Sequence, residues 1–130
     1  MKYICLGYMD ENKWNAMSES AQNAFVDECF AYDDVLRKKG HFAGGEALDS
    51  PGNSATLRYR NGKVIITDGP YAETREQLGG ILILEAADLN EAVQLIAKHP
   101  GVRLGGFEVR PTVDLSAVVE ESRQRRAAAK

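Results

Sequence analysis

Residues suited to acid–base chemistry gather in one stretch, residues 68–80, which reads Asp-Gly-Pro-Tyr-Ala-Glu-Thr-Arg-Glu-Gln-Leu-Gly-Gly. It lies between two apolar runs that are typical of buried strands, residues 64–67 and 81–85. Asp68 ends the first run, and a carboxylate that is partly removed from water at the rim of a pocket can transfer protons. His41 begins another predicted strand, where an imidazole can act as a general base. Asp68 and His41 are therefore the candidate catalytic residues; the alternative is that Asp68 only accepts backbone N–H groups of its own turn.

Four further residues are candidates for binding a small molecule. Tyr71 and Glu73 lie in the charged stretch, where a phenol ring and a carboxylate can contact a ligand. Tyr8 lies on the predicted first strand, and Glu46 lies on the predicted strand of residues 41–48. We expect a cavity lined by these two strands and by the loop of the charged stretch. A solvated, charged loop is the alternative interpretation of that stretch.

We expect neither a metal ion nor an organic cofactor. His41, Glu46 and Asp68 are separated in the sequence and lack the local spacing of metal ligands. The glycine pairs at 44–45 and 79–80 do not belong to a phosphate-binding glycine motif, and no G-x-S-x-G nucleophile elbow occurs.

The two cysteines and the second histidine have simple structural interpretations. Cys5 lies in an apolar strand and Cys29 on the apolar side of a helix, so both are predicted to be buried thiols. His99 follows the last turn of a predicted helix, where a cationic side chain favours the helix dipole.

The composition limits the classes of partner. The 130 residues are 44% hydrophobic and carry a net charge of −3 with both signs interspersed, which fits one globular domain and argues against a nucleic-acid partner. No apolar run approaches the roughly 20 residues that span a membrane. The predicted first strand begins at Lys2, which leaves no room for a signal peptide, so we expect a cytoplasmic protein.

Hydrophobic periodicity predicts strands, helices and one hairpin. The Asn61-Gly62 pair is a strong hairpin signal. Ser18 and Asp88 are predicted helix N-caps. The predicted strands are residues 2–9, 41–48, 55–60, 63–67, 80–86 and 106–111, and the predicted helices begin at Ser18 and at Leu89 and end near Lys39 and Lys98. Residues 10–17 are predicted to be a polar connection. Residues 115–119 are predicted to form at most two helical turns, followed by a frayed end.

This order of elements predicts an α+β fold, the ferredoxin-like split β-α-β arrangement, over residues 1–113. Residues 114–130 then form a C-terminal extension. Both helices cover one face of such a sheet and leave the other face bare. Because the predicted strands are apolar on both faces, we expect a homodimer in which two sheets pack together.

The run 68–80, together with Met1-Lys2-Tyr3 and the run 107–111 (Phe-Glu-Val-Arg-Pro), resembles the YCII-related family over about residues 1–113. More narrowly it resembles the Asp-Gly-Pro-Phe (DGPF) branch, with Tyr71 in place of the phenylalanine. The resemblance implies a dimeric α/β barrel of ferredoxin-like subunits. Members of this branch often occur beside, or fused to, sigma factors of the extracytoplasmic-function type.

The resemblance also implies that some relatives carry a histidine on the first helix. In those relatives the histidine is proposed to form an acid–base pair with an aspartate. This sequence departs from that pattern, because no histidine precedes His41. The first long helix offers four acidic residues instead, Asp27, Glu28, Asp33 and Asp34.

Two functions follow as hypotheses. The first is a small-molecule-binding protein with cofactor-independent proton-transfer chemistry of the isomerase or lyase type, in which Asp68 is acid or base and His41 assists. The second is a non-catalytic ligand sensor or accessory module that is associated with sigma-factor-dependent transcription.

Overall fold

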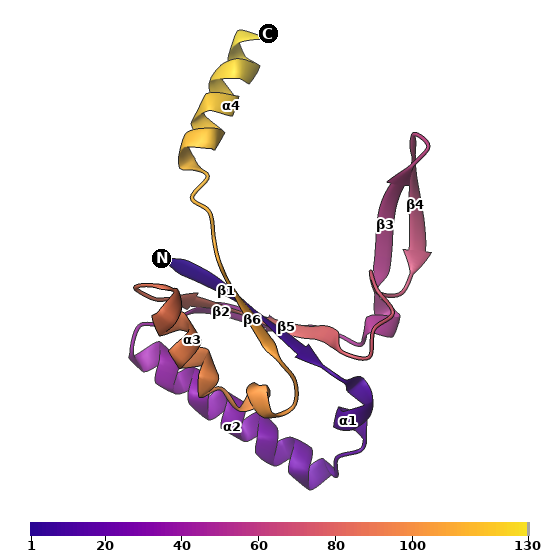
Figure 1. Cartoon of the computed structure of the whole chain (residues 1–130), viewed down its shortest axis with the longest axis vertical. Helices are drawn as coiled ribbons and strands as arrows, with labels where there is room; N and C mark the ends of the chain where they lie inside the picture. The colour runs from indigo at the N-terminus through magenta and orange to yellow at the C-terminus, as the bar shows by residue number, and fades with distance from the viewer. Residues whose placement is uncertain (130) are drawn as a thin grey trace.

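A four-stranded antiparallel sheet is the centre of the computed structural model, which describes residues 1–129 (Figure 1). Its strand order is β2-β5-β1-β6. The strands are β1 (Lys2–Met9), β2 (Phe42–Ala47), β5 (Gln77–Glu85) and β6 (Phe107–Pro111). The two long central strands, β1 and β5, pair along their whole length. This order, with a helix in each crossover, confirms the predicted α+β, ferredoxin-like fold.

Two helices, α2 (Glu19–Lys38) and α3 (Leu89–Ala97), lie under one face of the sheet (Figure 1). Both N-caps are as predicted: the Ser18 hydroxyl accepts from the Ala21 N–H at 3.1 Å, and the Asp88 carboxylate accepts from the Glu91 N–H at 2.8 Å. The helices pack on alternate residues of the strands. The resulting core consists of Tyr3, Cys5, Leu36, Leu82, Leu84, Ala86, Ala92 and Ile96.

The opposite face of the sheet is apolar in the middle. Strand pairing places Ile4 beside Ile83 and Leu6 beside Ile81, and all four side chains are half-buried. Charged residues surround them on the two outer strands; the register of β6 puts Arg110 next to Ile4. No helix of residues 1–129 covers this face in Figure 1.

The hairpin of β3 (Ala55–Arg60) and β4 (Lys63–Asp68) forms a separate two-stranded sheet. Its turn is as predicted, because Asn61 and Gly62 take the positive φ values of 52° and 77° that such a turn requires. The prediction that residues 64–67 are a buried strand is wrong, since every residue of β4 is exposed. The hairpin projects from the body instead of joining the main sheet (Figure 1).

Two other segments contain more helix than predicted. The connection after β1 includes a short helix, α1 (Glu11–Asn15), whose N-cap Asp10 accepts from the Asn12 N–H at 3.0 Å. The helix α4 (Ser116–Ala128) continues far beyond the one or two turns expected. Its alanine-rich end has high helix propensity, and Glu120 pairs with Arg123 one turn later at 3.0 Å. Among the described residues, no helix is long and apolar enough to cross a membrane.

Candidate functional site

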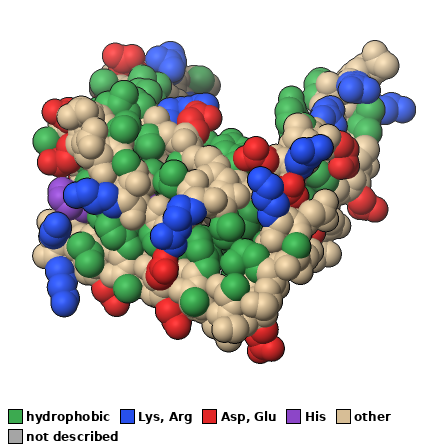
Figure 2. Space-filling view, turned by 60° about the horizontal axis from the view of Figure 1, so that its bottom comes forward, with side chains coloured by type: hydrophobic (Ala, Val, Ile, Leu, Met, Phe, Trp, Pro, Cys, Tyr) green, Lys and Arg blue, Asp and Glu red, His purple; other side chains and the backbone are tan. Residues whose placement is uncertain are grey.

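A pocket of about 440 Å³ lies between α2 and the sheet, a size that suits a small organic ligand. Most of its wall is apolar. Hydrophobic side chains gather over the middle of this side of the molecule, with charged side chains around them (Figure 2). The apolar lining comes from α2, the sheet and the segment after α3, and includes Phe25, Phe42, Leu82, Leu104 and Phe107.

Asp33 brings a carboxylate into this apolar pocket. It follows Phe25 and Cys29 at intervals of four residues, so α2 presents all three on one side. Its side chain is only 17% exposed, and its Oδ1 atom is buried without a hydrogen-bond partner among residues 1–129. Burial raises the pKa of Asp33, and the nearby His99 and Arg37 oppose that shift in part. A carboxylate of this kind is well suited to accept and return a proton.

His99 lies beside Asp33, with its Nε2 atom 3.7 Å from Oδ1 of the carboxylate. The side chain is 9% exposed. Its Nδ1 atom accepts a hydrogen bond from the Gly101 N–H at 2.9 Å, so the neutral ring carries its proton on Nε2, facing Asp33. Burial lowers the pKa of His99, while the Asp33 carboxylate opposes that change. The pair therefore places a neutral imidazole N–H beside a buried carboxyl group whose pKa is raised.

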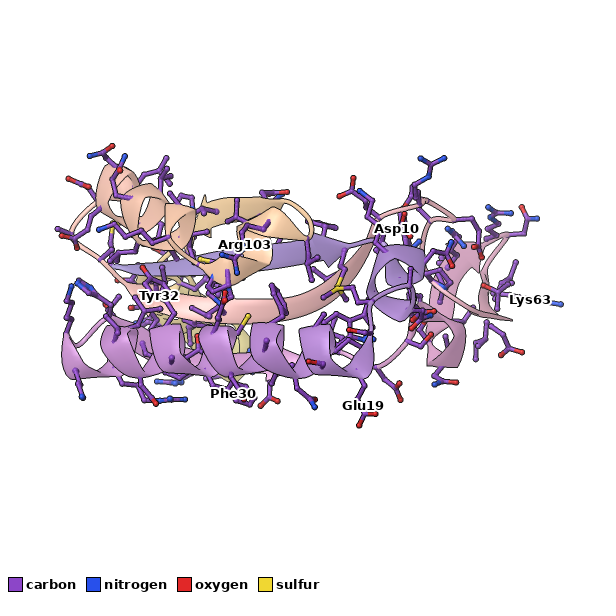
Figure 3. The ribbon with its side chains drawn as sticks, turned by 90° about the horizontal axis from the view of Figure 1, so that it is seen from below. Asp10, Glu19, Phe30, Tyr32, Lys63 and Arg103 are labelled. Atoms are coloured by element: carbon purple, nitrogen blue, oxygen red, sulfur yellow. The ribbon has the colours of Figure 1, made fainter. Side chains whose placement is uncertain are left out.

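Close packing fixes the position of the His99 ring. It meets the rings of Tyr32 and Phe107 edge to face, with centroid distances of 5.8 and 5.2 Å. Tyr32 points from α2 toward the sheet, and its hydroxyl donates to the carbonyl of Leu95 (Figure 3). Gly101 is required beside the ring, because a Cβ atom there would lie 2.9 Å from Phe107 and 3.0 Å from His99 Nδ1.

Arg37 supplies a positive charge to the pocket wall. Its guanidinium carbon lies 4.2 Å from the centroid of the Phe42 ring, and its Nη1 atom pairs with Asp34 at 2.8 Å. Among residues 1–129 this is the hydrogen bond that its guanidinium makes, which leaves N–H groups for a ligand oxygen. Cys29 lines the same pocket, and burial, with the negative charges of Asp33 and Glu28, raises its pKa to about 11.

Among the described residues, no group of three or more His, Cys, Asp or Glu side chains is arranged to hold a metal ion.

Two of the residues predicted from sequence, Tyr8 and Glu46, border this pocket. Strands β1 and β2 both line it. His41 lies outside it and contacts the Glu85 carbonyl oxygen through Nδ1 at 2.8 Å. Asp68 also lies outside it, exposed at the end of the hairpin. The structure therefore does not bring His41 and Asp68 together in this pocket.

The other two candidates lie in the exposed loop that follows the hairpin. The backbone carbonyl of Tyr71 accepts from Arg58 at 2.8 Å, and the Arg58 guanidinium carbon lies 4.7 Å from the centroid of the Tyr71 ring. Glu73 is exposed. The loop is held to the hairpin by these contacts and contributes nothing to the lining of the pocket.

Sequence reasoning missed the Asp33–His99 pair. One signal was present for Asp33, because its spacing from Phe25 and Cys29 places an acidic residue on the inner side of a helix. No comparable signal marks His99. Its place beside Asp33 depends on how the short 3-10 helix η2 (Pro100–Arg103) turns the chain back toward α2 after α3.

Comparison with known proteins agrees with this architecture. Residues 1–116 match the YCII-related domain. The chain belongs to the YCII-related domain family. An uncharacterised protein of Rhizobium meliloti (strain 1021) is 32% identical over 113 residues, which cover 85% of this chain and 91% of that protein. The YCII-related domain thus includes the sheet, the pocket, the hairpin and the start of α4.

Proposed function

We propose that this YCII-related protein binds a small, largely apolar organic molecule in the pocket under the sheet and transfers protons on it without an organic cofactor. The observation that carries the proposal is the Asp33 carboxylate, which places an unpartnered oxygen in an apolar pocket. A structural carboxylate in such a place would normally have its hydrogen bonds satisfied by the protein. An unsatisfied one is prepared for a proton of a ligand.

The chemistry that suits this arrangement begins with a C–H bond next to a carbonyl group. Asp33 Oδ1 accepts the proton, and the electron pair of the C–H bond forms a carbon–carbon double bond as the carbonyl oxygen takes up negative charge. Return of the proton to another carbon completes an isomerisation; departure of a leaving group from the adjacent carbon completes an elimination. His99 directs its Nε2–H toward Oδ1 of Asp33 from 3.7 Å, beyond hydrogen-bond distance, and favours the charged form of the carboxylate electrostatically.

The charge on Arg37 favours ligands with an oxygen that carries, or develops, negative charge. The aromatic side chains of the wall favour a flat hydrocarbon portion. Together these features suit a small cyclic carbonyl compound better than a sugar or a nucleotide.

Solvent hydrogen exchange tests this proposal directly. The protein is incubated in D₂O with a panel of small cyclic ketones, lactones and keto acids, and NMR follows the loss of each C–H next to a carbonyl. We expect exchange of at least one compound by the wild type and its loss in Asp33→Asn. Asp27→Asn makes the same change at an exposed position of the same helix and should exchange like the wild type.

Asp68→Asn distinguishes the pocket from the site first suggested by the sequence. If Asp33 is the proton-transfer group, Asp68→Asn exchanges at the wild-type rate. Exchange activity that survives Asp33→Asn and disappears in Asp68→Asn would contradict the proposal and would identify Asp68, at the end of the hairpin, as the proton-transfer group.

We also propose, on the resemblance of residues 68–80, that the protein lies in the Asp-Gly-Pro-Phe branch of the family. Both cysteines are free thiols, which supports a reducing compartment and therefore a cytoplasmic location. The apolar outer face of the sheet supports a homodimer. The alternative function, an accessory module for sigma-factor-dependent transcription, stays a prediction; co-purification of a sigma factor together with an inactive pocket would favour it.

A further inference from the structure

Two arms leave the body of the protein on the same side, away from α2 and α3 (Figure 1). One arm is the β3–β4 hairpin, and the other is α4. They start at opposite ends of β1. The hairpin leads into Gln77, which pairs with Met9 at the end of β1, whereas α4 follows Pro111, which pairs with Tyr3 near the start of β1.

The hairpin has one apolar face that nothing in the described chain covers. Strand pairing places Leu57 opposite Ile66 and Tyr59 opposite Val64. These four side chains are 59–73% exposed. Their neighbours in sequence lie on the other face, where Thr56 is buried. A two-stranded hairpin with an uncovered apolar face is marginally stable in water and needs a partner surface.

The second arm has the same property. No residue of α4 is buried within the chain. Leu115, Val118 and Val119 are exposed, and their spacing of three and four residues places them side by side on the first turns. An isolated helix of 13 residues is marginal in water, so it also needs a surface to pack against.

The exposed area indicates how large the missing contact is. A compact monomer of this mass, 14.3 kDa, exposes roughly 6800 Å². The chain exposes 9327 Å², roughly 2500 Å² more than that. A standard interface buries about 800 Å² on each partner, and obligate homodimers bury up to about 2500 Å². The excess is thus as large as the surface that one subunit contributes to an extensive, permanent dimer.

We propose that the hairpin of one copy of this chain packs against α4 of a second copy. A two-fold axis between facing sheets, perpendicular to β1, exchanges the two ends of the sheet. It therefore brings the hairpin of each copy to the end where α4 of the other copy begins. Because both arms leave the same face, the rotation also makes the hairpin and the partner's helix run in opposite directions.

Length and charge agree with this pairing. Strands of six residues and a helix of 13 residues both extend about 20 Å. Along α4 the acidic residues Glu120 and Glu121 precede its basic end. The hairpin base carries Asp68, and in the antiparallel arrangement it faces the end of α4 that contains its three arginines, 123, 125 and 126. Asp68 shares the face of Leu57 and Val64, so opposite charges meet at this end of the contact.

Sedimentation equilibrium of the full-length protein and its variants tests the contact. We expect a wild-type dimer at micromolar concentration. Val64→Asp puts a charge on the apolar face of the hairpin and should weaken the dimer at least about tenfold. Ile65→Asp makes the same change at the next residue, on the opposite face, and should dimerise like the wild type. Val118→Lys should weaken the dimer alone and strengthen it again when combined with Val64→Asp.

Positions 64, 65 and 118 are all exposed in the single chain, so each variant should fold, and circular dichroism checks this. A monomeric wild type would overturn the proposal and leave the arms for a different protein. A Val64→Asp dimer as tight as the wild type would also overturn the proposal, because the contact between the two sheet faces would then be sufficient for dimerisation. Equal effects of Val64→Asp and Ile65→Asp, or no rescue by Val118→Lys, would place the hairpin elsewhere on the partner and contradict its pairing with α4.

Discussion

Replacement of Asp33 by asparagine should abolish proton transfer and, at the same time, stabilise the protein. The carboxylate is buried, its Oδ1 atom has no hydrogen-bond partner in the described chain, and its pKa is raised by burial. An unsatisfied buried polar group costs about 1–3 kcal/mol and an unsatisfied charge costs more. Asparagine keeps the polar oxygen and removes only the charge, and the side chain is 17% exposed, so the low end of that range applies. Asparagine has the same shape without the charge. We therefore expect a gain of about 1 kcal/mol in the free energy of unfolding at pH 7, or a melting temperature about 3–5 °C higher.

The gain should depend on pH in a defined direction. A group whose pKa is raised by folding favours the folded state below its unfolded pKa, here 3.8, and loses that contribution as the pH rises through the folded value. The advantage of Asp33→Asn should therefore be present above the raised pKa of Asp33 and disappear as the pH falls toward 3.8.

Thermal or urea unfolding at pH 7 and near pH 4 measures both effects, with Asp27→Asn as the exposed control on the same helix. The control should unfold like the wild type at both values. A clear decrease in the free energy of unfolding of Asp33→Asn at pH 7 would refute the reasoning. It would show that the carboxylate stabilises the fold as a partner of His99 and does not destabilise it.

Three further predictions concern the same pocket. The exchange rate measured in D₂O should rise with pH through the raised pKa of Asp33, above 3.8, because only the carboxylate accepts a proton; a rate that falls over this range would contradict that role. Gly101→Ala should slow exchange while the protein stays folded, since its Cβ atom would displace His99 or Phe107 at a cost of about 1–3 kcal/mol. NMR titration of His99 checks that the ring has moved. An unchanged exchange rate and an unchanged titration would show that the ring position is not critical. Cys29, with a pKa of about 11, should react with iodoacetamide at pH 8 far more slowly in the native protein than in urea; equally fast modification would mean that the pocket wall is open to reagent and its thiol ionised.

The contrast between Asp68 and Asp33 shows how far the sequence leads. Asp68 was conspicuous because it begins a dense run of turn and charged residues, a signal that is local and therefore readable. In the structure these turn and charged residues shape the hairpin and its loop, as the contacts of Arg58 with Tyr71 show. Asp33 gave only a weak signal, because a helix with many acidic residues does not by itself reveal which of them is buried.

The sequence by itself determined the order of the elements and hence the fold. Alternating apolar residues, helix caps such as Ser18 and Asp88, and the Asn61-Gly62 turn are local patterns that act over a few residues. They were sufficient for the ferredoxin-like arrangement and for most element boundaries. They also indicated that the sheet has two apolar faces, of which the helices cover one.

Only the tertiary structure decided which side chains meet. The pairing of Asp33 with His99 joins residues 66 positions apart, through a crossing of α2 and η2 that no local pattern encodes. The position of the β3–β4 hairpin, outside the main sheet, was likewise not readable, because an alternating strand looks the same whether its apolar face meets its own core or awaits another surface. Burial is a property of the assembled molecule, and burial distinguishes the carboxylate suited to chemistry from those exposed to solvent.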